Sequence, residues 1–140
     1  MILLDTNVIS GLMAPQIAAP LADWLAAQPP NELYTASLCE AEIRYGIARL
    51  PQGQRRDRLD AAFATFLARG FAGRILVFDS ACAAASATIR VQREQAGRPL
   101  AFADAMIAGT AAAYGARIAT RNVGDFIDCG IAVDNPWASP

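Results

Sequence analysis

The chain has 140 residues, 54% of them hydrophobic, and a formal net charge of −1, which fits one domain, residues 1–140, whose core needs no disulfide or structural metal. It contains no histidine, and all twelve of its basic residues are arginine, which excludes a histidine base, a lysine Schiff base and a P-loop lysine. The balanced charge also excludes a protein that binds nucleic acid through an overall basic surface.

Short β-rich segments alternate with longer helical ones along the chain. Several of the short segments are continuous apolar runs, which is typical of a parallel sheet covered on both faces. This alternation predicts an α/β fold, a three-layer α/β/α domain with a central, mostly parallel sheet of about five strands. In chain order we expect a strand at 2–5, a helical turn at 7–13, a helix at 17–28, a strand at 33–35, helices at 37–50 and 53–69, a strand at 74–78, helices at 80–96 and 102–114, a strand at 116–120, a helical turn at 123–128 and a strand at 132–133.

The three cysteines are widely separated and odd in number. Cys39, Cys82 and Cys129 fit neither a disulfide framework nor a paired zinc motif, so we expect reduced, partly buried thiols. The sequence has no apolar run near the roughly 20 residues that span a bilayer and no export signal at its start. We therefore expect a cytoplasmic protein that does not interact with membranes.

The first expected strand ends abruptly in an acid. Leu3 and Leu4 are followed by Asp5, and ligand sites of open parallel sheets form beyond the carboxyl ends of the strands. Asp5 therefore lies where a ligand would bind. The alternative is that Asp5 or Thr6 merely caps the helix that follows.

The helix expected at 37–50 begins with a capping signature. Ser37 is followed three residues later by Glu40, the spacing of a capping box. Glu40 can also pair with Arg44 one turn further on. The sequence thus gives Glu40 a structural role.

Glu42, in the same helix, has no such local role. It shares a helix face with Leu38 and Tyr45, so we expect it to point toward packed surface. An acid there is unfavourable unless it is paired or binds a metal. The alternative is a partly exposed Glu42 that bonds to Arg49.

Two further acids lie beyond residue 100. Asp104 is the one charge in the first turn of an otherwise apolar helix, where the helix dipole alone would favour it. Asp125 follows the strand that ends at Thr120, and either Asp125 or Asn122 caps a short helix or faces the same crevice as Asp5.

These acids lack local ion-pair partners and fall at strand ends and inner helix faces. Brought together, they would repel one another and stay partly protonated unless a cation intervened. A site of oxygen ligands without histidine or cysteine suits Mg²⁺ or Mn²⁺ and argues against zinc. Such an ion can activate water and polarise a phosphodiester, which would replace the missing histidine base.

Four segments, in order, resemble the motifs of PIN-domain proteins: residues 2–10, 41–47, 103–108 and 120–126. The ending Asn135-Pro136-Trp137 is similar to that of FitB-like members of the VapC group. The resemblance covers essentially the whole chain. It implies a PIN fold and Mg²⁺- or Mn²⁺-dependent endoribonuclease activity, as the toxin of a VapBC-type toxin–antitoxin pair.

The resemblance also implies residue roles. Asn122 stands where some relatives carry an acid, so either Asp125 is the fourth acid or the site has three. Arg121 and the arginines of 55–58 are candidates for contacts with RNA phosphates, although the latter group also fits a solvated helix face. The metal-binding and catalytic acids carried over by motif are Asp5, Glu42, Asp104 and Asp125, and the supporting polar residues are Thr6, Asn7, Thr120 and Asn122.

The expected partners follow from the same resemblance. They are an RNA substrate, with transfer RNA among the candidates, and a cognate VapB-like antitoxin that wraps the toxin and joins it to operator DNA. A homodimer is also expected. The apolar faces near 17–28 and 102–114 either form such interfaces or pack into the core.

Two other functions are considered. The chain could be a FitB-like regulatory module that acts with a DNA-binding antitoxin and has little or no nuclease activity, for which Asn122 leaves room. A receiver or aspartate-nucleophile phosphatase also places acids at strand ends, but both families generally use a lysine, which this chain lacks.

Overall fold

A computed structural model describes residues 1–138 of the chain. Its centre is a sheet of five parallel strands in the order β3-β2-β1-β4-β5. The expected mostly parallel sheet is therefore confirmed, and all of its pairings are parallel. The strands are β1 (Ile2–Leu4), β2 (Leu33–Ala36), β3 (Ile75–Leu76), β4 (Arg117–Ala119) and β5 (Val133–Asp134).

The helices fall close to the predicted ranges, and most differ by one or two residues at their ends. The largest difference is at the first long helix, which is shorter than predicted because Pro20 sits in its first turn and proline is favoured there. The helices are α1 (Thr6–Leu12), α2 (Ala19–Ala26), α3 (Ser37–Ala48), α4 (Gln54–Gly70), α5 (Ser80–Gln95), α6 (Phe102–Tyr114) and α7 (Val123–Phe126), with a short 3-10 turn, η1 (Pro30–Glu32).

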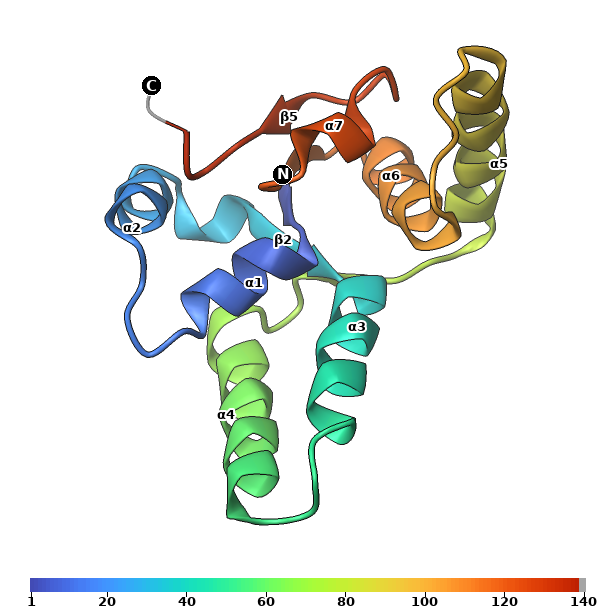
Figure 1. The fold of residues 1–140 in the computed structure, drawn as a ribbon. Helices are drawn as coiled ribbons and strands as arrows, with labels where there is room; N and C mark the ends of the chain where they lie inside the picture. The colour runs from blue at the N-terminus through green and yellow to red at the C-terminus, as the bar shows by residue number, and fades with distance from the viewer. Residues whose placement is uncertain (139–140) are drawn as a thin grey trace.

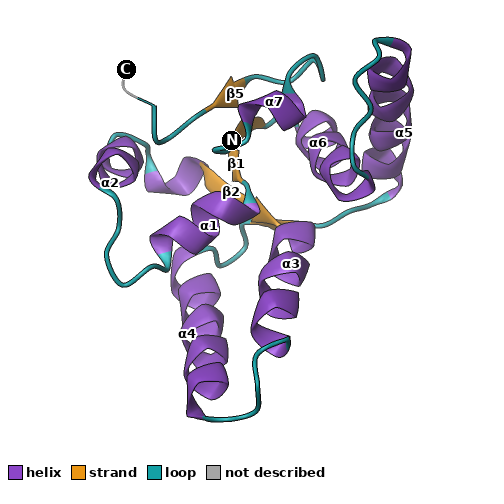
Figure 2. Cartoon of the chain, in the orientation of Figure 1, coloured by secondary structure: helices purple, strands orange, loops and turns teal. Residues whose placement is uncertain are grey.

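Alternate side chains of β1 face two separate cores, as the pleat of a strand requires. Leu3 packs with residues of α5, α6 and α7, whereas Ile2 and Leu4 pack with residues of α1, α2 and α4. The sheet is thus covered on both faces, which confirms the three-layer arrangement (Figure 1; Figure 2). Helix α3 contributes to both cores, through Cys39 on one side and Ile43 on the other.

Helices α5 and α6 lie side by side as a pair (Figure 1). They approach closely at Gly109 of α6, where an added Cβ would lie 1.9 Å from the hydroxyl oxygen of Ser86 and 2.6 Å from its backbone nitrogen. Only glycine fits this contact. The pair is important for the site because Asp104 lies at the start of α6.

Two expectations about α3 are wrong. Ser37 is the first residue of the helix, and Ala36 occupies the N-cap without a side-chain hydrogen bond, so the predicted capping box does not form. The predicted pairing of Glu40 with Arg44 is present, at 3.0 Å. Tyr45 is 64% exposed, so the face it shares with Glu42 is not packed as expected.

The cysteines are free and buried, as expected. Burial, followed by the charge of Asp5, raises the pKa of Cys39 to about 12, so this thiol stays protonated and is a poor nucleophile. Within residues 1–138, no helix has the length and apolar character needed to cross a bilayer.

Candidate active site

The strand ends β1 and β4 bring Asp5 and Thr120 together. Leu4 and Ala119 are paired in register, so the next residue of each strand lies at the same edge of the sheet. The hydroxyl of Thr120 donates to Asp5 Oδ2 at 2.8 Å, and the backbone N–H of Thr6 donates to Asp5 Oδ1 at 2.8 Å. Asp5 is also the N-cap of α1, so the expected cap is present, but capping is not its only contact because Thr120 bonds to its other oxygen.

Thr120 uses its full hydrogen-bonding capacity here. Besides donating to Asp5, its oxygen accepts from Asn7 Nδ2 at 3.1 Å and from the backbone N–H of Asn122 at 3.0 Å. The side-chain oxygen of Asn7 accepts from the backbone N–H of Arg121 at 3.1 Å. These contacts tie the start of α1 to the segment after β4, more than a hundred residues away in sequence.

Asp5 is 94% buried by area, being 6% exposed. Burial raises the pKa of Asp5, the hydrogen bonds from Thr120 and Thr6 lower it, and the charge of Asp125 raises it again. The net effect is a raised pKa. Asn7 Nδ2 is a third donor, at 3.4 Å from Asp5 Oδ2, and an acid whose pKa stays raised despite such donors lacks a positive partner.

Glu42 reaches the same place from α3. The Thr6 hydroxyl donates to Glu42 Oε1 at 3.1 Å, so Thr6 bonds to both acids, to Asp5 through its backbone N–H and to Glu42 through its side chain. Burial of the carboxylate raises the pKa of Glu42, the bond from Thr6 opposes this, and the charge of Asp5 adds to it. Glu42 is nevertheless an exposed residue at the rim, and its partner is Thr6 and not Arg49.

Asp104 lies in the first turn of α6 and is half-buried. Burial raises its pKa to about 6, with further contributions from the charges of Asp125, Asp5 and Glu42. Arg93 opposes this increase. The mutual effects on pKa indicate that the four acids named from the sequence share one electrostatic environment.

Asp125 lies in the single turn of α7 and is exposed. Asn122 is the N-cap of this helix but forms no side-chain capping bond. Within the described residues, no hydrogen bond is donated to the carboxylate of Asp125 or of Asp104. The charge of Asp125 raises the pKa of both Asp5 and Asp104, so its carboxylate lies near theirs.

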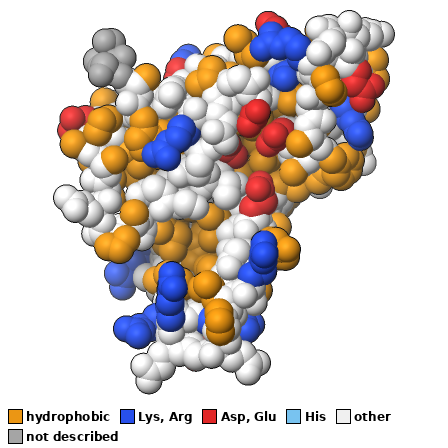
Figure 3. Space-filling view, viewed as in Figure 1, with side chains coloured by type: hydrophobic (Ala, Val, Ile, Leu, Met, Phe, Trp, Pro, Cys, Tyr) orange, Lys and Arg blue, Asp and Glu red, His pale blue; other side chains and the backbone are white. Residues whose placement is uncertain are grey.

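The acids form a cluster without being gathered around one point. Acidic side chains collect at the centre of the face seen in Figure 3, between the helices of the two layers. Among residues 1–138, no three His, Cys, Asp or Glu side chains are already arranged to hold a metal ion. The donors are all carboxylate, hydroxyl and amide oxygens, which suit a hard divalent cation. Uncompensated carboxylates repel, so a bound cation would be expected to draw them closer.

Arg121 stands next to this network. Its guanidinium carbon lies 4.0 Å from the centre of the Trp137 ring, within cation–π range. Trp137 in turn packs against α1, where an added Cβ on Gly11 would lie 3.0 Å from the indole. The guanidinium therefore lies on an aromatic surface, while the backbone N–H of Arg121 joins the network around Asp5 through Asn7.

The sequence analysis did not identify Arg93, which is buried behind Asp125. The signal was present, because the buried residues of α5 recur at positions 82, 86, 89 and 93, a single helical face. An arginine at the last of these positions lies on an apolar face and must find acceptors inside the protein.

The fold is a parallel three-layer α/β domain, and several carboxylates lie at the carboxyl edge of its sheet. The model of the PIN domain family matches residues 2–128, and the chain belongs to that family.

Three relatives and one solved structure agree with this assignment. The chain is 42% identical to plasmid stability protein StbB of Pseudomonas syringae, 39% to toxin FitB of Neisseria gonorrhoeae and 36% to VapC ribonuclease Y4jK of Sinorhizobium fredii, in each case over 98% of this chain and 98–99% of the relative. A structure of FitAB bound to an IR36 DNA fragment matches with 38% identity and a TM-score of 0.93, covering 100% of this chain and 98% of the other.

Proposed function

We propose that the protein is a metal-dependent endoribonuclease and the toxin of a VapBC-type toxin–antitoxin pair, acting in the cytoplasm. The observation that carries this proposal is the cluster of four acids from four separate segments. The pKa of Asp104 is raised to about 6. Within residues 1–138, no arginine forms an ion pair with any of the four carboxylates. The similarity to a VapC ribonuclease supports the choice of RNA.

Asp5, Asp104 and Asp125 would hold Mg²⁺ or Mn²⁺, and Glu42 would share in binding or orient a water molecule. A divalent ion bound there supplies Lewis-acid polarisation of a phosphodiester and a more acidic water. Thr120 and the start of α1 keep Asp5 in place, and Thr6 fixes Glu42. Arg121, whose guanidinium stacks on Trp137, would contact an RNA phosphate.

The partners proposed are a cognate antitoxin and, through it, operator DNA. A groove of about 350 Å³ begins at Thr6 and Glu42 and continues over apolar residues of α1, α3 and α4, among them Ile43 and Ile47. An antitoxin segment that filled this groove would also cover Glu42. The solved FitAB complex on DNA supports such an assembly, in which we expect the toxin to be a homodimer.

Cleavage of total RNA by the purified chain tests the enzymatic proposal. We expect cutting that requires Mg²⁺ or Mn²⁺, and Asp5→Asn and Asp104→Asn to reduce it by at least about 100-fold, the upper end of what losing an outer-shell partner alone does. Asp23→Asn, an exposed acid on α2, is the matched control and should cleave normally. Undiminished cutting in EDTA, or by Asp5→Asn, would refute the proposal.

The second candidate function is a regulatory module that acts with a DNA-binding antitoxin and cleaves little RNA. The similarity to FitAB on DNA favours it. Operator binding by the toxin–antitoxin complex, combined with no cleavage of any RNA by the free chain in Mn²⁺, would select this function over the nuclease.

A further inference from the structure

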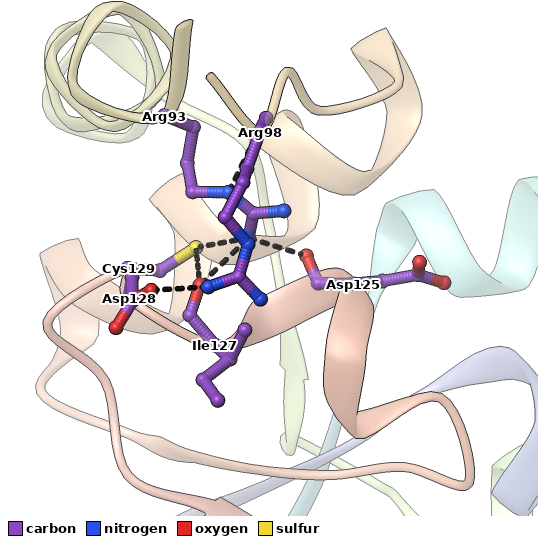
Figure 4. A network of polar contacts seen from close by, with 6 residues as sticks. All are labelled: Arg93, Arg98, Asp125, Ile127, Asp128 and Cys129. Carbon is purple, nitrogen blue, oxygen red and sulfur yellow. Dashed lines mark hydrogen bonds and ion pairs between the residues drawn. The ribbon is translucent and has the colours of Figure 1, made fainter. Parts of the chain in front are cut away.

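Arg93 is a buried, positively charged residue that the proposed function does not use. It lies in the last turn of α5 and is 5% exposed. Its Nε donates to the backbone oxygen of Arg98 at 2.7 Å, and its Nη1 donates to the backbone oxygens of Ile127 at 2.7 Å and Asp125 at 3.2 Å (Figure 4). The Sγ of Cys129 lies 3.6 Å from the same Nη1.

A buried guanidinium is unfavourable unless its donors find acceptors. Within residues 1–138, Arg93 takes part in no ion pair with a carboxylate, and its recorded oxygen acceptors are all peptide carbonyls. A leucine or methionine would fill the same space without a desolvated charge. We therefore expect the role of Arg93 to lie in the segment that it binds, the backbone from α7 to Cys129.

The side chains of Phe126 and Cys129 anchor this segment in the core, but its peptide carbonyls need partners. Helix α7 is a single turn of four residues without a side-chain cap, and the free carbonyls at the end of a helix favour a cation. Arg93 supplies one. In Figure 4 the carbonyl of Asp125 faces Arg93, while its carboxylate points away from the arginines.

We propose that Arg93 is a positioning residue for the acid site. Its hydrogen bonds to the carbonyls of Asp125 and Ile127 hold Asp125 beside Asp104 and leave the carboxylate of Asp125 free. The proposal rests on the proposed function for the role of Asp125. Arg93 bonds to the peptide group of Asp125, so both carboxylate oxygens remain available as ligands.

A second arginine also binds the segment after α7. Arg98 donates to Asp128 Oδ2 at 2.6 Å, and Asp128 has a positive φ of 60°, a conformation that only a few residue types adopt readily. The backbone N–H of Arg98 also donates to the carbonyl of Arg93 at 2.8 Å. The turn after α7 is thus fastened to the end of α5 at several points.

Amide hydrogen exchange tests, without RNA or metal, whether Arg93 holds α7 in place. In Arg93→Lys, which keeps the charge but lacks the planar fork of donors, we expect the amides of Asp125 and Ile127 to exchange at least about tenfold faster, while the amide of Arg49, the C-cap of α3, is unchanged. Arg90→Lys, on the exposed side of α5, should change none of them. Equal protection in Arg93→Lys and wild type would overturn the proposal.

A double-mutant cycle on RNA cleavage tests whether Arg93 acts on catalysis through Asp125. Arg93→Lys should lower kcat about tenfold in the wild-type background but less than about twofold in Asp125→Asn, because interacting sites are not additive. An equal loss in both backgrounds would mean a merely structural role and would overturn the proposal. If Arg93→Lys does not fold, Arg93→Met, which removes the buried charge, takes its place in both experiments.

The two proposals can fail separately. If the wild-type chain cleaves no RNA in Mn²⁺, the proposed function fails, and the exchange rates of Asp125 and Ile127 alone decide whether Arg93 holds α7.

Discussion

The acid cluster contains two regions, which we call its corners, around Asp5 and around Asp125, and the acid is held in a different way in each. At the first, Asp5 is buried and its carboxylate is bonded directly by Thr6 and Thr120. At the second, Asp125 is exposed on a single helical turn, and its peptide carbonyl is bonded by the buried Arg93. The first corner fixes a carboxylate through its own oxygens, and the second fixes it through its backbone.

The two arrangements have different chemical consequences. A direct hydrogen bond stabilises the ionised acid but occupies an oxygen that could bind a cation. A backbone contact leaves both oxygens free but gives the charge no direct stabilisation. A site that must attract a cation and also hold it in a defined place gains from having one corner of each kind.

The largest effect is expected where α5 meets α6, because that contact sets the positions of both Asp104 and Arg93. An added methyl in Gly109→Ala would overlap Ser86, including its backbone nitrogen, so we expect a loss of about 3 kcal/mol in the free energy of unfolding. Gly46→Ala in α3, where nothing lies within 4 Å, is the control and should stabilise by about 0.5–1 kcal/mol. Urea denaturation measures both, and equal stability of the two variants would contradict the close contact.

An intermediate effect is expected at the Asp5 corner. Thr120→Val keeps the shape of a fully buried side chain but removes the donor to Asp5, which should lower the free energy of unfolding by about 1–3 kcal/mol. At the other corner Asn122→Ala removes no side-chain cap and should change it by less than about 0.5 kcal/mol. Thermal unfolding of the two variants sharpens the comparison, and a larger loss in Asn122→Ala would reverse it.

The smallest effect is a pH dependence caused by Asp104. Its pKa in the folded protein is about 6, above the ordinary value of 3.8, so between these values the folded state binds more protons than the unfolded state. The metal-free protein should therefore lose stability as pH rises through this range. Because Asp104 is half-exposed, we expect a change of about 1 kcal/mol.

Urea denaturation at about pH 4.5 and about pH 7 measures this term as the difference between wild type and Asp104→Asn. The wild type should gain stability relative to the variant at the lower pH. A difference that is independent of pH would mean that burial and the neighbouring acids do not raise the pKa of Asp104.

The sequence was sufficient to predict most of the fold and the place of Asp5 at the edge of the sheet. The apolar runs and the glycine and proline positions determine the alternation of strands and helices, and a strand that ends in Asp5 points to the edge of a parallel sheet. The partnership of Asp5 with Thr120 could be expected only in outline, because it depends on the pairing of β1 with β4.

The second corner was less accessible to sequence reasoning. Asp125 was named, but what holds it was not, because Arg93 meets its acceptors 32 and 34 residues further along the chain. Such contacts follow from how α5 packs on α7. The capping box at Ser37 was wrong for a related reason, since the continuation of β2 to Ala36 makes Ser37 the first residue of α3.

The central claim is that these acids bind at least one divalent cation, and a crystal soaked in Mn²⁺ tests it most directly through the anomalous signal of the metal. The account predicts a peak within coordination distance of Asp5 and Asp104, which is lost in Asp104→Asn. A well-ordered soaked crystal with no peak near these two residues, or with manganese bound only elsewhere, would contradict it.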